Sequence, residues 1–244
     1  MIGSSAGMRQ ALAQASHHGR HRSAFGGRLS EQPLMQNVLA DLALESEAAL
    51  AYTMRIAKSL DSQHLEHERL LARLATPVGK YWICKRTPNH AYEAMECIGG
   101  SGVMEDCIMP RLLRESPVNA IWEGSGNVQC LDTLRALQKE PDTLDAFFSE
   151  AAEARGADAR FDRFLAQLQN DFADISDFEY RARNLVDRLA LLMQSSLLLR
   201  NSDPAVADAF CASRLEHNGG LNYGNLPSGT DPAAIIKRAT PVVG

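Results

Sequence analysis

One carboxylate, Glu123, stands in a setting that suits acid–base chemistry. It follows the apolar pair Ile121-Trp122 and precedes Gly124-Ser125. Partial burial beside the apolar side chains would raise the pKa of the carboxyl group, and a raised pKa suits a base that removes a proton next to a carbonyl group. The alternative is an exposed glutamate near a helix N-terminus, which is the commoner role of a Glu before Gly-Ser. The residues themselves leave both interpretations open.

Arg22 and Phe25 are two further residues whose side chains could bind a cofactor. The planar, permanently charged guanidinium of Arg22 could hold a phosphate oxygen. The ring of Phe25 offers a flat face for a flavin or an adenine. The alternative is a solvated arginine beside a core phenylalanine, and composition alone favours it because Phe is usually buried.

Three glycines, Gly99, Gly100 and Gly102, follow a long helical pattern. Glycine allows positive φ and a close approach of backbone to a ligand. It serves equally well as the end of a helix followed by a turn. Because no strand precedes these residues, they are not the glycine fingerprint of a dinucleotide-binding fold.

Two other groups of residues carry weaker signals. The histidines lie near two helix faces, but carboxylates and thiols are not placed to complete a metal site, so we expect surface or packing roles and no metal. These histidines are His17, His18, His21, His64 and His67. Lys85-Arg86 beside Trp82 could touch nucleic acid, although a short basic step on a helix is usually solvated.

Helical periodicity dominates the elements that would position these residues. Ser30 is an N-cap type for the second helix, the Gly99-Gly100 pair should end the third, and Pro77 and Pro88 should kink or interrupt that third helix. The expected helices are residues 6–21, 30–60, 65–98, 109–114, 127–137, 143–154, 159–172, 178–200 and 205–217, followed by a loop over residues 218–230. The pattern predicts an all-α fold, with a four-helix bundle over residues 1–140 and a smaller helical extension over residues 141–244.

Composition narrows the class of protein. The chain has 244 residues, of which 45% are apolar and 23% charged, and a formal net charge of −5, which does not favour non-specific binding to nucleic acid or an anionic membrane. No uncharged apolar run approaches the ~18 residues of a membrane span. Five cysteines without a Cys-x-x-Cys pair argue against a disulfide framework, and the first residues lack the features of a signal peptide, so a cytoplasmic location is expected.

Three motifs in order resemble the acyl-CoA dehydrogenase family. Residues 22–26 match R-x-x-F-G, and residues 96–102 match Q-x-x-G-G-x-G with Glu96 in place of Gln. Residues 111–115 and 121–125 match R-x-x-R-D followed by I-Y-E-G-T. The amino-acid sequence of residues 83–86 and 117–127 is similar to that of the AidB-like branch of the family, which is implicated in the alkylation response. The resemblance covers about residues 1–140 strongly and the remainder weakly.

The resemblance implies a role for each motif. Glu123 would take the α-proton of an acyl-CoA thioester while the β-hydrogen passes as hydride to FAD, Gly124 would let the acyl chain lie close, and Ser125 and Asn127 would contact the flavin. Further residues would reach the FAD of a neighbouring subunit; these are Arg22, Phe25, Glu96, Gly99 and Gly100. A carboxylate at Glu96 would repel a pyrophosphate unless it is protonated or turned away.

The resemblance also implies a homotetramer, a dimer of dimers, and further domains that this chain lacks. The chain would then be a piece of a longer protein or a remnant of one. Two other functions stay open: a DNA-associated flavoprotein of the alkylation response with little dehydrogenase activity, and a non-catalytic interaction module. Residues 141–244 contain ten Lys and Arg against fifteen Asp and Glu, whereas residues 1–140 contain fifteen of each. This balance disfavours DNA binding by the extension, because binding requires neutralisation of phosphates.

Overall fold

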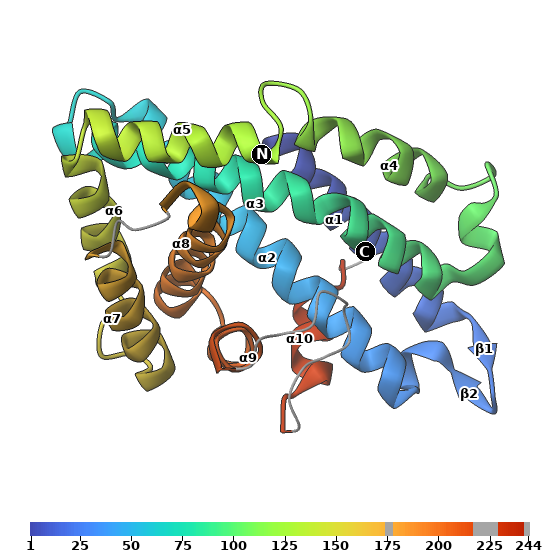
Figure 1. Ribbon diagram of the computed structural model, residues 1–244. Helices are drawn as coiled ribbons and strands as arrows, with labels where there is room; N and C mark the ends of the chain where they lie inside the picture. The colour runs from blue at the N-terminus through green and yellow to red at the C-terminus, as the bar shows by residue number, and fades with distance from the viewer. Residues whose placement is uncertain (174–177, 217–228, 242–244) are drawn as a thin grey trace.

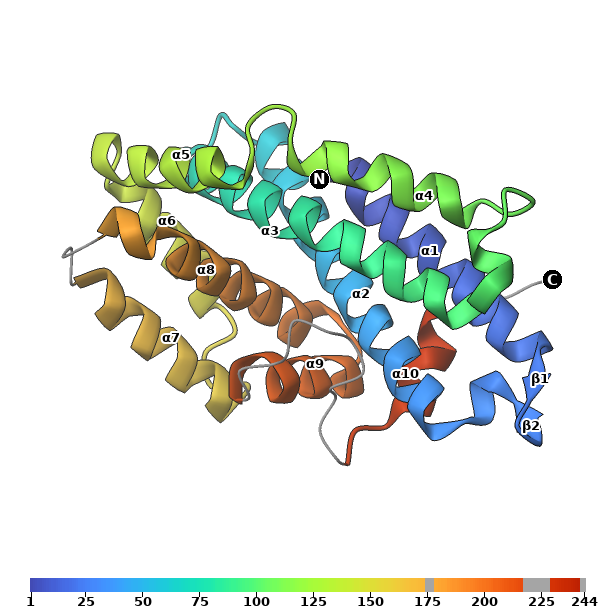
Figure 2. The ribbon, with the colours of Figure 1, turned by 45° about the vertical axis from the view of Figure 1, so that its right-hand side comes forward.

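The computed structural model describes residues 1–173, 178–216 and 229–241, and it is almost entirely helical (Figures 1 and 2). The α-helices are α1 (Ile2–His21), α2 (Pro33–Asp61), α3 (Glu66–Ile98), α4 (Met109–Glu115), α5 (Gly126–Lys139), α6 (Asp142–Ala152), α7 (Ala159–Ala173), α8 (Phe178–Asn201), α9 (Pro204–Cys211) and α10 (Pro232–Ala239). Short elements connect them: the strands β1 (Ser23–Ala24) and β2 (Gly27–Arg28), the 3-10 turns η1 (Leu29–Glu31), η2 (Gly99–Val103) and η3 (Ser116–Ala120), and the π-turn η4 (Ala212–Glu216). The predicted all-α fold is confirmed.

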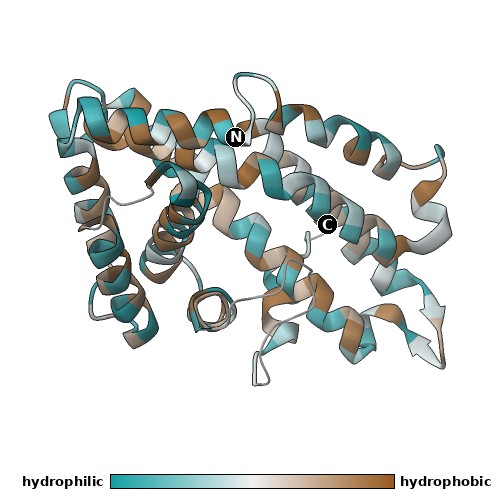
Figure 3. Ribbon diagram, in the orientation of Figure 1, coloured by the Kyte–Doolittle hydropathy of each residue, from teal (hydrophilic) through white to brown (hydrophobic). Residues whose placement is uncertain are grey.

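The long helices α1, α2 and α3 run side by side, and α4 and α5 lie along α3 (Figures 1 and 2). Small residues such as Ala11 and Ala15 let α1 approach its neighbours closely, and both are fully buried. Apolar and polar residues are interspersed along the helices (Figure 3), and the buried apolar residues form the core between the helices. Burial of these residues supplies most of the stabilisation, because isolated helices are marginal in water.

The helices α6, α7 and α8 pack on one end of this bundle, whereas α9 and α10 pack farther along α2. Phe147 of α6, Phe161 of α7 and Leu189 of α8 are fully buried in one apolar cluster that also contains Tyr52 of α2 and Leu74 of α3. The extension therefore shares a hydrophobic core with the bundle. The division of the chain at residue 140 into two domains stays a prediction.

The predicted interruption of the third helix is wrong. α3 continues from Glu66 to Ile98 with Pro77 and Pro88 inside it. A proline in a helix interior costs ~3 kcal/mol, since it removes one hydrogen bond and crowds the preceding turn. Burial of neighbours on both sides, among them Val78 and Ile83, outweighs this cost.

Three local features differ from the sequence-based expectation. Ser30 is not an N-cap, because Gln32 holds that position and α2 starts at Pro33. The glycines after α1 form a hairpin turn in which Ser23 pairs with Arg28. The helix α10 was not predicted: it packs against α2 through the buried Ile235. Most of the loop expected over residues 218–230 lies outside the described residues.

Two expected absences can be compared with the structure. All five cysteines are free thiols, as the lack of pairing motifs predicts. Within residues 1–173, 178–216 and 229–241, no helix combines the length and the apolar character needed to cross a bilayer.

Candidate active site

Glu123 lies in a short loop between η3 and α5, and its backbone is held in an uncommon conformation. Its φ of 56° is left-handed, which costs ~1–2 kcal/mol for a residue with a Cβ atom. Gly124 follows with a φ of 106°, and a Cβ atom there would lie 2.6 Å from Nε2 of Gln129. A strained non-glycine residue persists only where its surroundings fix it.

Two side chains fix this loop through its carbonyl oxygens. Lys80 of α3 donates from Nζ to the carbonyl oxygens of Trp122 at 2.8 Å and Gly124 at 2.5 Å. Gln129 of α5 donates from Nε2 to the carbonyl oxygen of Glu123 at 2.8 Å. Burial lowers the pKa of Lys80 from its ordinary value, and the negative charge of Glu123 opposes this shift only in part. We call Lys80 and Gln129 the loop clamp.

The Glu123 side chain is exposed, so the burial expected from its neighbours is absent in this chain. Ile121 is 63% exposed and Trp122 is 59% exposed. The Glu123 carboxylate makes no hydrogen bond or ion pair with any described residue. The loop therefore presents a carboxylate directly after two uncovered apolar side chains, because no other part of the described chain packs over them.

The start of α5 carries Ser125 and Asn127 beside Glu123. Ser125 is the N-cap residue, but its side chain makes no capping hydrogen bond. Backbone N–H groups in the first turn of a helix attract anionic groups. The Asn127 side chain is already engaged, since its Oδ1 accepts a hydrogen bond from Nε of Arg183 on α8 at 2.8 Å. Its amide NH₂ is the part left for a ligand.

Arg22 and Phe25 lie at the hairpin after α1. Phe25 sits at the hairpin tip with a φ of 53° and is 94% exposed. The interpretation of Phe25 as a core residue is therefore wrong. Arg22 is exposed as well. An aromatic ring in water at the tip of a turn has no packing role within the chain.

Glu96, Gly99 and Gly100 lie at the end of α3. Gly99 is the C-cap with a φ of 75°, and both glycines are exposed. The Glu96 carboxylate accepts a hydrogen bond from the Tyr92 hydroxyl at 3.2 Å, which directs it along the helix. The third glycine has a packing role, because a Cβ at Gly102 would lie 2.8 Å from the carbonyl oxygen of Met95.

The predicted residues form two separate groups. The hairpin with Arg22 and Phe25 and the turn after α3 lie at the same end of the bundle, whereas the Glu123 loop lies about midway along it, where α5 starts (Figures 1 and 2). A single chain therefore does not bring all of them into one pocket. The sequence analysis did not identify the loop clamp, because nothing in the spacing of Lys80 or Gln129 relates these residues to Glu123.

The histidines that the sequence analysis weighed as metal ligands are not part of a metal site among the described residues. Among the described residues, no three side chains of His, Cys, Asp or Glu are grouped to hold a metal ion. The rings of His17 and His21 instead pack together with centroids 4.3 Å apart.

Comparison with known proteins places residues 1–138 in the family described as acyl-CoA dehydrogenase, C-terminal domain. The chain is 40% identical to AidB of Escherichia coli (strain K12) over 220 residues, which cover 90% of this chain and 40% of AidB. The crystal structure of Caenorhabditis elegans ACDH-11 in complex with C11-CoA matches with a TM-score of 0.81 and 25% identity, over 91% of this chain and 43% of that one. A Bacillus anthracis acyl-CoA dehydrogenase complexed with FAD, 17% identical with a TM-score of 0.64, shares the fold. The chain thus spans about two fifths of its relatives' length.

Proposed function

The chain belongs to the acyl-CoA dehydrogenase family, and we propose that it supplies the catalytic base and part of the flavin site of an FAD-dependent acyl-CoA dehydrogenase. The observation that carries this proposal is the Glu123 loop. A carboxylate without a hydrogen-bond or ion-pair partner among the described residues is held in a strained conformation by the loop clamp and follows two exposed apolar residues. Such an arrangement suits a base that an apolar substrate covers.

In the proposed reaction, Glu123 removes the α-proton of an acyl-CoA thioester. FAD, when bound, accepts the β-hydrogen as hydride. Lys80 and Gln129 keep the Glu123 backbone in place, and Ile121 and Trp122 contact the acyl chain and exclude water. The substrate and FAD would cover Glu123 in the complete site, so the exposure of Glu123 in this chain is compatible with the proposed role.

The residues present fit two partial flavin sites. Ser125 and the amide of Asn127 lie next to the base, where they serve the flavin of the same subunit. Arg22, Phe25 and the Gly99-Gly100 turn face solvent at the far end of the bundle. We propose that this second group contacts the FAD of a neighbouring copy, in a homotetramer.

The test is a chimeric protein in which residues 1–244 replace the matching part of Escherichia coli AidB. We expect Glu123→Gln to keep the flavin absorbance and to lose about 10²–10⁴-fold in turnover of a branched acyl-CoA. Glu179→Gln, at an exposed position on α8, is the control and should leave turnover unchanged. Full turnover by the Glu123→Gln protein would remove this residue from the mechanism.

The second candidate function is that of a DNA-associated flavoprotein of the alkylation response, which the similarity to AidB favours. The charge distribution weighs against the extension as the DNA-binding part. Several of its arginines pair with carboxylates, among them Arg160 with Asp158 at 2.5 Å and Arg163 with Glu216 at 2.8 Å. Flavin reduction by acyl-CoA in the chimera would separate the two functions.

A further inference from the structure

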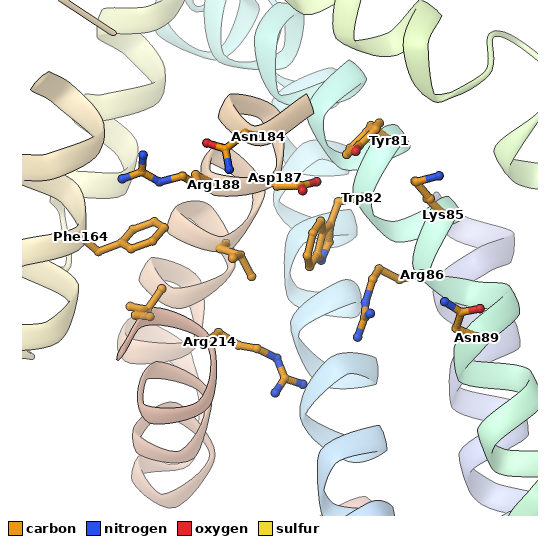
Figure 4. A pocket seen from close by; sticks show the side chains of 12 residues that line it. Tyr81, Trp82, Lys85, Arg86, Asn89, Phe164, Asn184, Asp187, Arg188 and Arg214 are labelled. Carbon is orange, nitrogen blue, oxygen red and sulfur yellow. The ribbon is translucent and has the colours of Figure 1, made fainter. Parts of the chain in front are cut away.

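A cavity of about 400 Å³ lies between α3 of the bundle and the helices of the extension (Figure 4). Tyr81 and Trp82 of α3 form one wall, and Phe164 of α7 and Arg188 of α8 form the opposite one. Pockets for small ligands commonly have ~300–1,000 Å³ and occur where separate packing units meet. The cavity is separate from Glu123, although Tyr81 also packs near Gly126, where a Cβ would lie 3.4 Å from its ring.

The walls of this cavity combine aromatic rings with cations. The Arg86 guanidinium lies over the Trp82 ring, with Cζ 5.5 Å from the ring centroid. The Arg188 guanidinium lies over the Phe164 ring at 5.3 Å. Aromatic rings and guanidinium groups in the same walls can together bind a flat ligand and its negative charge.

The cations are fixed from behind by buried carboxylates. Arg214 of the π-turn pairs with Asp41 and, at 3.6 Å, with Glu45, while Arg86 pairs with Glu45 at 3.3 Å. Both carboxylates are about 1–2% exposed, so they hold the guanidinium groups in one arrangement before any ligand arrives. Such preorganisation lowers the cost of binding.

Cationic side chains outnumber carboxylates in the lining of the cavity itself. Four cationic side chains line the cavity, namely Lys85, Arg86, Arg188 and Arg214, against the single carboxylate of Asp187. The carboxylates of Asp41 and Glu45 pair with Arg214 and Arg86, and Asp171 pairs with Arg188. Lys85 is exposed at the rim. Burial raises the pKa of Asp187 to about 6, against the hydrogen bond from Tyr81 and the charges of Lys85 and Arg183, so this carboxyl group is still mostly ionised at pH 7 and becomes neutral only as the pH falls below about 6.

We propose that this cavity binds a small, flat organic anion, an aromatic carboxylate, between the Trp82 and Phe164 walls. The ring of the ligand stacks against the aromatic side chains, and its carboxylate accepts hydrogen bonds from Arg188, while the exposed Lys85 on the other side attracts the anion at longer range. The site requires both the bundle and the extension.

Calorimetric titration of the chain with three matched compounds tests this proposal. 4-Hydroxybenzoate should bind with a Kd on the order of 0.1–1 mM, a value appropriate to a ligand of this size. The flat neutral 4-hydroxybenzamide and the non-planar anion 4-hydroxycyclohexanecarboxylate should each bind about tenfold more weakly, because one lacks the charge and the other the flat face. Equal affinity for all three, or no heat with 4-hydroxybenzoate, would overturn the proposal.

Variants locate the binding. Arg188→Gln should weaken binding of 4-hydroxybenzoate about tenfold. Lys85→Gln, at an exposed position that places no demand on folding, should weaken it by a smaller factor. The control Arg163→Gln removes an exposed arginine outside the cavity lining and should leave the Kd unchanged. Wild-type affinity in both lining variants would place the ligand elsewhere.

Fluorescence gives an independent readout. The chain has two tryptophans, Trp82 and Trp122, so a Trp122→Phe protein reports on Trp82 alone. Saturating 4-hydroxybenzoate should change that emission with the Kd found by calorimetry. Glu123→Gln should bind 4-hydroxybenzoate as wild type does, so this inference can fail or succeed independently of the proposed dehydrogenase function. A constant Trp82 emission in the presence of bound ligand would contradict the assignment.

Discussion

Glu150→Gln should destabilise the fold strongly, because the Glu150 carboxylate joins four helices. Its side chain is 4% exposed on α6. It accepts hydrogen bonds from Nε of Arg55 on α2 at 2.8 Å and from Nη2 of Arg200 on α8 at 2.6 Å. Arg55 also donates to Glu68 of α3 at 2.7 Å. Glutamine would keep the shape and one oxygen acceptor but would leave two buried cations short of one negative charge.

The size of the effect follows from the pKa of Glu150. Burial alone would raise this pKa, but the hydrogen bonds and charges of Arg55 and Arg200 outweigh burial and hold it at about 2, against an ordinary value of 4.5. A difference of this size corresponds to ~3 kcal/mol of stability. For a chain of this length the melting temperature should fall by ~6–12 °C. Because the folded-state pKa is lowered, the contribution is complete above pH 4.5 and is lost as the pH falls from 4.5 to about 2.

Urea unfolding of the wild-type and variant chains at pH 7 and at pH 3 measures this contribution. The difference between wild type and Glu150→Gln should shrink at pH 3. The control is Glu153→Gln, whose carboxylate pairs with the same Arg200 but is 58% exposed, so its loss should cost under ~1 kcal/mol. A Glu150→Gln protein within 0.5 kcal/mol of wild type at pH 7, on the order of experimental error, would refute the reasoning.

Three further predictions concern the loop and the surfaces. In the chimera with AidB, Lys80→Met should lower turnover by about tenfold and keep bound FAD, since it frees the carbonyl oxygens of Trp122 and Gly124; equal turnover would show that Gln129 suffices. The chain alone should self-associate and should not hold FAD stoichiometrically as a monomer, because Phe25 and Leu34 are 94% and 86% exposed; a yellow, flavin-bound monomer in sedimentation would contradict this. Finally, duplex DNA should bind the chain weakly at ~150 mM salt, and sub-micromolar affinity with a steep salt dependence would reveal a basic surface that the charge balance misses.

Much of the helical architecture could be predicted from local patterns. Apolar residues at helical spacing placed most helices within a few residues of their observed ends, and Gly99 marked the end of α3 because glycine adopts its φ of 75° without strain. The motif around Glu123 identified a loop residue whose carboxylate could act as a base. Such signals are readable because they depend on neighbours along the chain.

Other features depend on residues that are distant in sequence. The exposure of Phe25 and Trp122 could not be inferred from their apolar character, since burial depends on what packs over a side chain. The helix α10 forms at a site where the flank of α2 offers an apolar surface to Ile235.

The sequence by itself determined the helices, their polarity and the family motifs, because periodicity and turn residues act over a few neighbouring positions. Only the tertiary structure decided that α3 continues through Pro77, since the gain from burying both faces of the helix exceeds the cost of a proline. It alone decided that Lys80 holds the Glu123 loop and that the two groups of predicted flavin residues lie apart. These outcomes depend on free energies of packing and on distances between helices, which no local pattern encodes.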